Sequence, residues 1–172
     1  DCNDAKGLFK ASINDKNLSA ESKCKIINIF AKACGPKGMV EGQNLDIKAE
    51  NKKLNEQQLD KVHYLKTGKL IEACVLAVCL LKKKIKEEEI TKLINFSKKF
   101  GLAFQIRDDI LDVIGDEKNI GKPVGSDQNK NKSTYPSILG LEKSQKKAQK
   151  LADTGIKILK SLPYDTKKLE DL

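Results

Sequence analysis

Residues 104–112 place three aspartates on one narrow strip of a predicted helix. At about 100° per residue, four polar side chains fall within an arc of roughly 100°: Gln105, Asp108, Asp109 and Asp112. The opposite side is apolar: Leu102, Ile106, Ile110 and Val113. Phe104 and Leu111 flank the acidic arc. A helix that is apolar around most of its circumference is normally buried, so these carboxylates are predicted to lie in a protein interior.

A buried group of carboxylates calls for a cation. Each uncompensated buried carboxylate costs several kcal/mol, because it loses hydration and is repelled by its neighbours. Oxygen ligands suit a hard ion, and Mg²⁺ usually takes one or two carboxylates together with phosphate oxygens of a substrate. The strip therefore predicts a Mg²⁺ site with Asp108, Asp109 and Asp112 as candidate ligands. The alternative, a solvated acidic face, is disfavoured by the flanking Phe104 and Leu111.

The rest of the chain has helical periodicity and no β-type alternation of useful length, so the predicted class is all-α. Ser19 and Asn55 are predicted N-caps of helices over 20–34 and 56–81. The second half of the helix over 56–81 is apolar all round, which predicts a central position in a bundle. Gly35 and the following proline break the first helix.

The second half of the chain is predicted to hold further helices. One covers 87–114 with a kink at Gly101, and one or two more follow a helix start at 133–136. The long polar loop over 117–134 is expected to act as a lid that carries lysines over a bound polyanion, a flexible surface loop being the alternative. The tail after Pro163 is expected to fray.

Composition limits the class of partner. The 172 residues are 39% hydrophobic and 33% charged, with a net charge of +9 that comes almost entirely from lysine. A basic surface suits phosphate ligands, an anionic membrane or nucleic acid. Aromatic residues make up only 5%, tryptophan is absent and Arg107 is the only arginine, which argues against nucleic acid. The longest apolar run, residues 73–81, is too short for stable membrane insertion.

Cysteine usage indicates a reducing compartment. The five cysteines form no CxxC pair, and an odd count without metal-ligand spacing fits the cytoplasm. The sequence shows no signal-peptide pattern, which agrees with a cytoplasmic location.

Three further polar positions leave alternatives open. Gly38 and Gly42 predict the close approach of another helix, and the same helix carries Asp46 together with Gln43 as either packing anchors or cavity-lining groups. Lys66 enters the apolar half of its helix, and spacing alone favours snorkelling to solvent over contact with an anion. His63, the only histidine, has no nucleophile or carboxylate pattern around it in sequence and is interpreted as an ordinary surface or helix-flank residue.

Several of these segments also form one recognisable set. Residues 101–112 read GLAFQIRDDILD, and further segments of the same set are 38–46, 66–68, 121–122, 125–128 and 132–136. Together they resemble the trans-isoprenyl diphosphate synthase family, most closely its bacterial farnesyl diphosphate synthases. Residues 101–112 match the second aspartate-rich motif of that family, and the resemblance covers about residues 31–162.

The resemblance implies an isoprenoid-synthase-type helical bundle and a Mg²⁺-dependent condensation of an allylic diphosphate with isopentenyl diphosphate. It implies that Asp108 is the primary metal ligand, supported by Asp109 and Asp112. The residues that it places at the allylic diphosphate and the reacting carbon are Lys66, Thr67, Gln105, Lys122 and Lys132. It also implies a homodimer.

The first aspartate-rich motif of the family has no counterpart in this sequence. We therefore expect residues 1–172 to be the C-terminal part of a single prenyltransferase domain. A geranylgeranyl or other short-chain synthase, a non-catalytic subunit of the same fold and a terpene cyclase are the alternatives. A cyclase normally carries an Asn/Ser/Glu metal triad in place of the Asp-Asp-x-x-Asp pattern found here.

Overall fold

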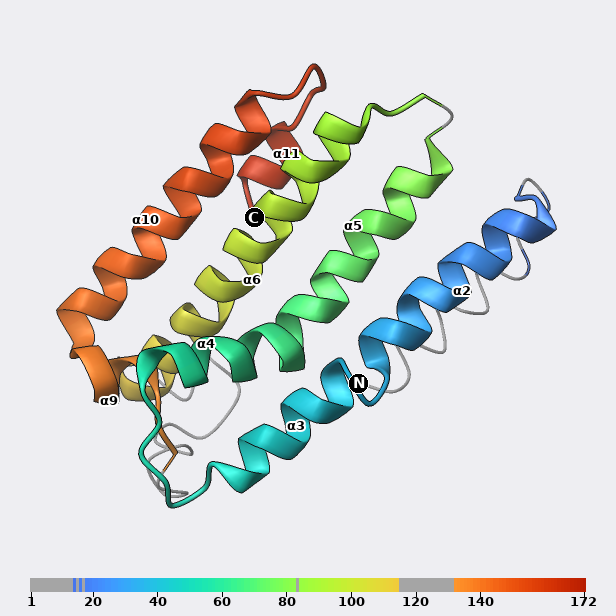
Figure 1. Cartoon of the computed structure of the whole chain (residues 1–172). Coiled ribbons are helices and arrows are strands. Elements are labelled where there is room, and N and C mark those ends of the chain that lie inside the picture. The colour runs from blue at the N-terminus through green and yellow to red at the C-terminus, as the bar shows by residue number, and fades with distance from the viewer. Residues whose placement is uncertain (1–13, 15, 17, 83, 115–131) are drawn as a thin grey trace.

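The computed structural model describes residues 14, 16, 18–82, 84–114 and 132–172, and confirms the all-α class for that part of the chain. In order, the elements are α2 (Ala20–Cys34), α3 (Met39–Lys48), α4 (Glu56–His63), the π-helical turn η1 (Tyr64–Gly68), α5 (Lys69–Leu81), α6 (Glu87–Ile114), α9 (Tyr135–Leu139), α10 (Leu141–Lys160) and α11 (Lys167–Glu170). In Figure 1, α2, α5, α6 and α10 lie side by side, and α3 continues from the lower end of α2 and packs against η1 and α4.

Local chemistry sets the helix starts, as predicted. The Ser19 hydroxyl accepts the backbone N–H of Ser22 at the start of α2. Asn55 forms a capping box with Gln58 at the start of α4. Thr134 forms a second capping box with Ser137, and α9 begins with a proline in its first turn. Each cap satisfies backbone donors that a helix leaves without an intrahelical partner.

Three apolar clusters hold these helices together. The first joins α2 to α5 through Phe30 and Ala73. The second joins α4, α6 and α9 through Leu59, Ile106 and Tyr135. The third packs Phe96 of α6 against Leu159 and Leu162 at the end of α10. Burial of apolar surface in these clusters is the main stabilising contribution, and it fixes α4 and α9 against the aspartate-bearing half of α6.

The segment predicted as one helix over 56–81 contains a five-residue π-helical turn, η1. This correction matters because Lys66 and Thr67 lie in that turn. A π-helical turn adds a residue to the local repeat and shifts the faces that follow it, and such turns are frequent at functional sites. The apolar end of α5 is also less buried than expected, since Val78 is 67% exposed and Leu81 48% exposed.

Two further predictions need correction. Residues 87–114 form one helix through Gly101, and the role of this glycine is packing: a Cβ there would lie 3.3 Å from the Cα of Gly68 in η1. The tail after Pro163 forms α11, and it is held in place by Tyr164, whose hydroxyl donates to the Glu89 carboxylate. Tyr164 explains why the tail does not fray.

Some predictions lie outside the described residues. These are the lid function of most of the 117–134 loop, the motif segments 121–122 and 125–128, and the position of Lys122. Among the helices that the structure describes, none combines the length and apolar content needed to cross a membrane.

Candidate active site

Helix α3 lies close to η1 because Gly42 has no side chain. A Cβ at Gly42 would lie 2.3 Å from the backbone nitrogen of Lys66 and 2.6 Å from its Cα. Real Cβ atoms do not approach backbone atoms this closely, so only glycine permits the contact. The predicted close approach at Gly42 is therefore confirmed, and its consequence is that α3 sits directly against Lys66.

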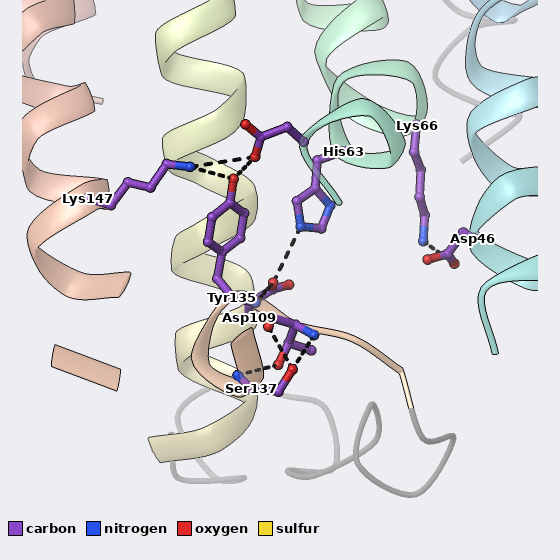
Figure 2. Close-up of polar contacts among 9 residues, drawn as sticks. Asp46, His63, Lys66, Asp109, Tyr135, Ser137 and Lys147 are labelled. Carbon is purple, nitrogen blue, oxygen red and sulfur yellow. Dashed lines mark hydrogen bonds and ion pairs between the residues drawn. The ribbon is translucent and has the colours of Figure 1, made fainter. Parts of the chain in front are cut away.

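This contact brings Asp46, one turn after Gly42, to the two lysines of the candidate site. Asp46 Oδ2 accepts from Lys66 Nζ at 2.9 Å and from Lys132 Nζ at 2.7 Å. A second carboxylate oxygen, Glu50 Oε1, lies farther from Lys132 Nζ, at 3.9 Å. Figure 2 shows Lys66 reaching from η1 towards Asp46 on α3. Two ammonium groups from segments far apart in the sequence are thus held next to one another.

Electrostatics keep this cluster charged. Burial opposes ionisation of Asp46, but the hydrogen bonds and positive charges of Lys132 and Lys66 outweigh it, so the pKa of Asp46 lies below its ordinary value. Lys66 makes an ion pair in place of the solvent-directed conformation that spacing alone favoured. Gln43, on the same helix as Asp46, is exposed and does not join the cluster.

The three aspartates of α6 differ in burial. Asp112 is 2% exposed and Asp109 6% exposed, whereas Asp108 is partly exposed. In the described part of the chain, no three His, Cys, Asp or Glu side chains converge closely enough to hold a metal ion by themselves. Asp108 and Asp112, one helical turn apart, supply the one or two carboxylates that Mg²⁺ takes when substrate oxygens complete its coordination. The donor set fits Mg²⁺ on that basis.

Asp109 is engaged by protein groups. Its Oδ2 accepts the backbone N–H of Tyr135 at 2.9 Å and lies 3.4 Å from Nε2 of His63 (Figure 2). Burial raises the pKa of Asp109, His63 counteracts this in part, and the nearby Asp108 and Asp112 add to the rise. The interpretation of His63 as a surface residue was wrong: the ring is 8% exposed and stacks on Tyr135, with centroids 5.8 Å apart.

A second polar group surrounds the hydroxyl of Tyr135. The hydroxyl donates to the Asp60 carboxylate and accepts from Lys147 Nζ at 2.9 Å. Lys147 also donates to Glu56 at 2.6 Å and lies 4.4 Å from the centre of the Tyr135 ring. Burial raises the pKa of Asp60, and the charge of Lys147 acts in the opposite direction. These contacts fix the tyrosine between α4 and α10.

Thr67 and Gln105 lie on facing elements, η1 and α6, and both are half-buried. The two elements cross where Gly68 meets Gly101, one residue after Thr67 and one turn before Gln105. The structure therefore brings Lys66, Thr67, Gln105, Lys132 and the α6 aspartates to neighbouring segments.

Sequence reasoning missed three features of this site: the burial of His63, the role of Tyr135 and the π-helical turn. The first two depend on contacts between residues far apart in the chain, such as His63 and Asp109, which are 46 positions apart. A weak signal for His63 was present, since it lies three residues before Lys66 in a segment with functional residues.

The arrangement suits a polyanionic ligand. Lysine ammonium groups are point charges that bind phosphate oxygens. Lys66 and Lys132, already desolvated in part and held together by Asp46, can share one phosphate-bearing ligand with less loss of side-chain freedom than two solvated lysines.

Comparison with known proteins identifies the family. The family model described as polyprenyl synthetase matches residues 3–168. Farnesyl diphosphate synthase of Bacillus subtilis is 41% identical over 165 residues, covering 92% of this chain and 55% of that protein. Geranylgeranyl diphosphate synthase of Cyanophora paradoxa is 39% identical over 139 residues, covering 80% and 46%.

Solved structures show the same relationship. The crystal structure of a geranyltransferase from Helicobacter pylori, complexed with magnesium and isoprenyl diphosphate, superposes with a TM-score of 0.82 at 34% identity. The superposition covers 95% of this chain and 53% of that one. The chain spans about half the length of the relatives it matches. It belongs to the polyprenyl synthetase family, whose helical fold it shares.

Proposed function

We propose that the protein is a Mg²⁺-dependent prenyltransferase that condenses an allylic diphosphate with isopentenyl diphosphate to give farnesyl diphosphate. The observation that carries the proposal is the convergence of Lys66 and Lys132 on Asp46, on segments adjoining the aspartate-bearing face of α6. The farnesyl and geranylgeranyl diphosphate synthases among its relatives support the reaction class.

The reaction begins with cleavage of the allylic C–O bond, in which diphosphate leaves with the electron pair. The double bond of isopentenyl diphosphate then attacks the allylic cation at C1, and the new cation loses a proton to the departing diphosphate. The protein supplies no nucleophile. It must hold the diphosphate so that the negative charge that develops on the leaving oxygen is stabilised.

In this proposal Lys66 and Lys132 bind the diphosphate oxygens, and Lys122 adds a third ammonium group by resemblance. Asp108 is the primary ligand of Mg²⁺, and Asp112, one turn further along α6, supports it. When bound, Mg²⁺ neutralises charge on the leaving diphosphate. Thr67 and Gln105 line the space next to the reacting carbon.

The whole-protein properties are proposals of the same kind. We propose a homodimer located in the cytoplasm, with isopentenyl diphosphate as its second substrate. A geranylgeranyl product is the second candidate, because a geranylgeranyl diphosphate synthase is among the relatives at 39% identity.

Product analysis tests the proposal. The full-length protein would be incubated with dimethylallyl and isopentenyl diphosphates, with Mg²⁺ or with a chelator, and the products identified by mass spectrometry. Farnesyl diphosphate that forms only with Mg²⁺ is the expected result. A C20 product would favour the second candidate. Release of no diphosphate and no prenyl product would contradict the proposed reaction.

A further inference from the structure

Asp109 differs from its neighbouring aspartates in what it contacts. A single oxygen, Oδ2, accepts the backbone N–H of Tyr135 at 2.9 Å and lies 3.4 Å from Nε2 of His63. A carboxylate oxygen has two lone pairs, so this one can accept the Tyr135 N–H together with a proton carried on Nε2 of His63. Asp109 is therefore distinguished from Asp108 and Asp112 by these contacts of its Oδ2 with Tyr135 and His63.

The partner at the other end of this contact is rigid. The Tyr135 residue is 0% exposed, and its ring stacks on His63 at an interplanar angle of 18°. The hydroxyl contacts of Tyr135 with Asp60 and Lys147 fix the far end of the side chain. The backbone N–H of this residue is tied to α6 by its hydrogen bond to Asp109.

Tyr135 ends a short segment, residues 132–135, that we call the strap. Lys132 lies at its other end and reaches Asp46. Between them, the Ser133 hydroxyl donates to the carbonyl of Lys52 at 3.0 Å and accepts the N–H of Leu54 at 2.9 Å. Ser133 holds the strap to the α3–α4 linker, and the Tyr135 N–H holds it to Asp109 on α6.

We propose that Asp109 is a positioning residue that holds the strap, and through it Lys132, in place for the diphosphate, and that it is not a ligand of the cation. This inference rests on the proposed function, in which Lys132 binds diphosphate. It gives Asp109 a different role from Asp108 although the two are adjacent. His63 acts on the same contact by orienting the carboxylate.

The test compares Asp109→Ala, Asp109→Asn and Asp108→Asn in the full-length protein. An asparagine Oδ1 can accept from both Tyr135 and His63, so Asp109→Asn keeps the anchor and removes the charge, whereas alanine removes both. Three quantities are measured: hydrogen exchange of the Tyr135 amide, calorimetric affinity for inorganic pyrophosphate without metal, and Mn²⁺ affinity by electron paramagnetic resonance.

We expect Asp109→Ala to speed exchange of the Tyr135 amide and to weaken metal-free pyrophosphate binding about tenfold, through displacement of Lys132. Removal of a negative charge by itself would strengthen anion binding, so a loss of affinity requires displacement of the lysine. Asp109→Asn should restore both quantities. Asp108→Asn should weaken Mn²⁺ binding more than Asp109→Asn does.

Equal losses of Mn²⁺ affinity in Asp109→Asn and Asp108→Asn, or unchanged Tyr135 exchange in Asp109→Ala, would overturn the proposal. If Asp109→Ala does not fold, Ser133→Ala removes the other anchor of the strap and should weaken pyrophosphate binding similarly, with Ser133→Thr restoring it. Unchanged binding in Ser133→Ala would then count against the proposal.

Failure of the proposed function would give a different set of results from failure of the role proposed for Asp109. A wild-type protein that binds no pyrophosphate and forms no prenyl product would refute the reaction. The Tyr135 exchange and the two asparagine variants would still decide whether Asp109 anchors the strap.

Discussion

Replacement of Gly42 by alanine tests how the site is built. The added Cβ would lie 2.3 Å from the backbone nitrogen of Lys66 and 2.7 Å from the carbonyl carbon of Leu65. Ordinary contacts between heavy atoms are about 3.5–4.0 Å, so α3 and η1 must separate by about 1 Å. Because the obstructing atoms belong to the backbone, no side-chain rotation relieves the clash.

Two opposing contributions determine how much Gly42→Ala changes the free energy of unfolding. Forced overpacking costs about 1–3 kcal/mol, and a clash against backbone belongs at the upper end of that range. Alanine is favoured over glycine inside a helix by about 1 kcal/mol. The net expectation is a loss of about 2 kcal/mol in the free energy of unfolding. If the contact at Gly42 did not restrict the packing, the helix preference of alanine would instead raise the free energy of unfolding. Separation of α3 from η1 also draws Asp46 away from Lys66, and pyrophosphate affinity should fall about tenfold.

Urea unfolding and calorimetric titration of the full-length protein with pyrophosphate measure the two effects. Gly140→Ala is the matched control. Gly140 has φ 81° and ψ 156°, a conformation that costs other residues about 1–3 kcal/mol, and a Cβ there meets no atom within 4 Å. It should lose similar stability and keep pyrophosphate affinity. A Gly42→Ala variant that is as stable as wild type and binds pyrophosphate equally well would refute the reasoning.

Three other expectations follow from the same site. Asp108→Ala should lower kcat by about 100-fold or more in steady-state assays, since a metal-borne contact to the leaving group is lost; a rate within about threefold of wild type would contradict the metal assignment. Lys66→Ala and Lys132→Ala should each weaken binding of an allylic diphosphate mimic by about 1–3 kcal/mol in titration calorimetry, and the double variant should be non-additive because both lysines share Asp46 Oδ2. The depressed pKa of Asp46 should stabilise the fold above its ordinary pKa of 3.8, and this contribution should be lost as pH falls through the lower folded-state pKa. In urea unfolding between neutral and acidic pH, the free energy of unfolding of Asp46→Asn should therefore fall less steeply with acidification than that of wild type. An equally steep fall would argue against the Lys66–Asp46–Lys132 cluster.

Features set by neighbouring residues were predictable from the sequence. Ser19 and Asn55 were identified as caps because capping chemistry acts within three residues along the chain. The periodicity of residues 102–113 predicted the helix that carries the aspartates. The glycine at position 42 predicted a close approach, although only the structure identifies Lys66 as the residue it meets.

Features set by distant residues were not predictable in this way. The sequence pattern around His63 indicates a surface residue, because Asp109 and Tyr135 are distant in the chain. The packing of α4, α6 and α9 brings both residues to its ring. The spacing of Lys66 favours a side chain directed to solvent, whereas in the structure it forms an ion pair with Asp46 of α3. The family resemblance places Lys66 and Lys132 at a diphosphate, but it carries no information on Asp46, the carboxylate that they share.

The most direct test of the central claim is a crystal structure of the full-length protein with pyrophosphate and Mn²⁺. We predict that pyrophosphate oxygens contact Lys66 Nζ and Lys132 Nζ, and that the anomalous signal of Mn²⁺ lies next to the carboxylate of Asp108. An ordered pyrophosphate bound elsewhere, with the Lys66–Asp46–Lys132 cluster unchanged, would contradict the claim that these two lysines form the diphosphate site.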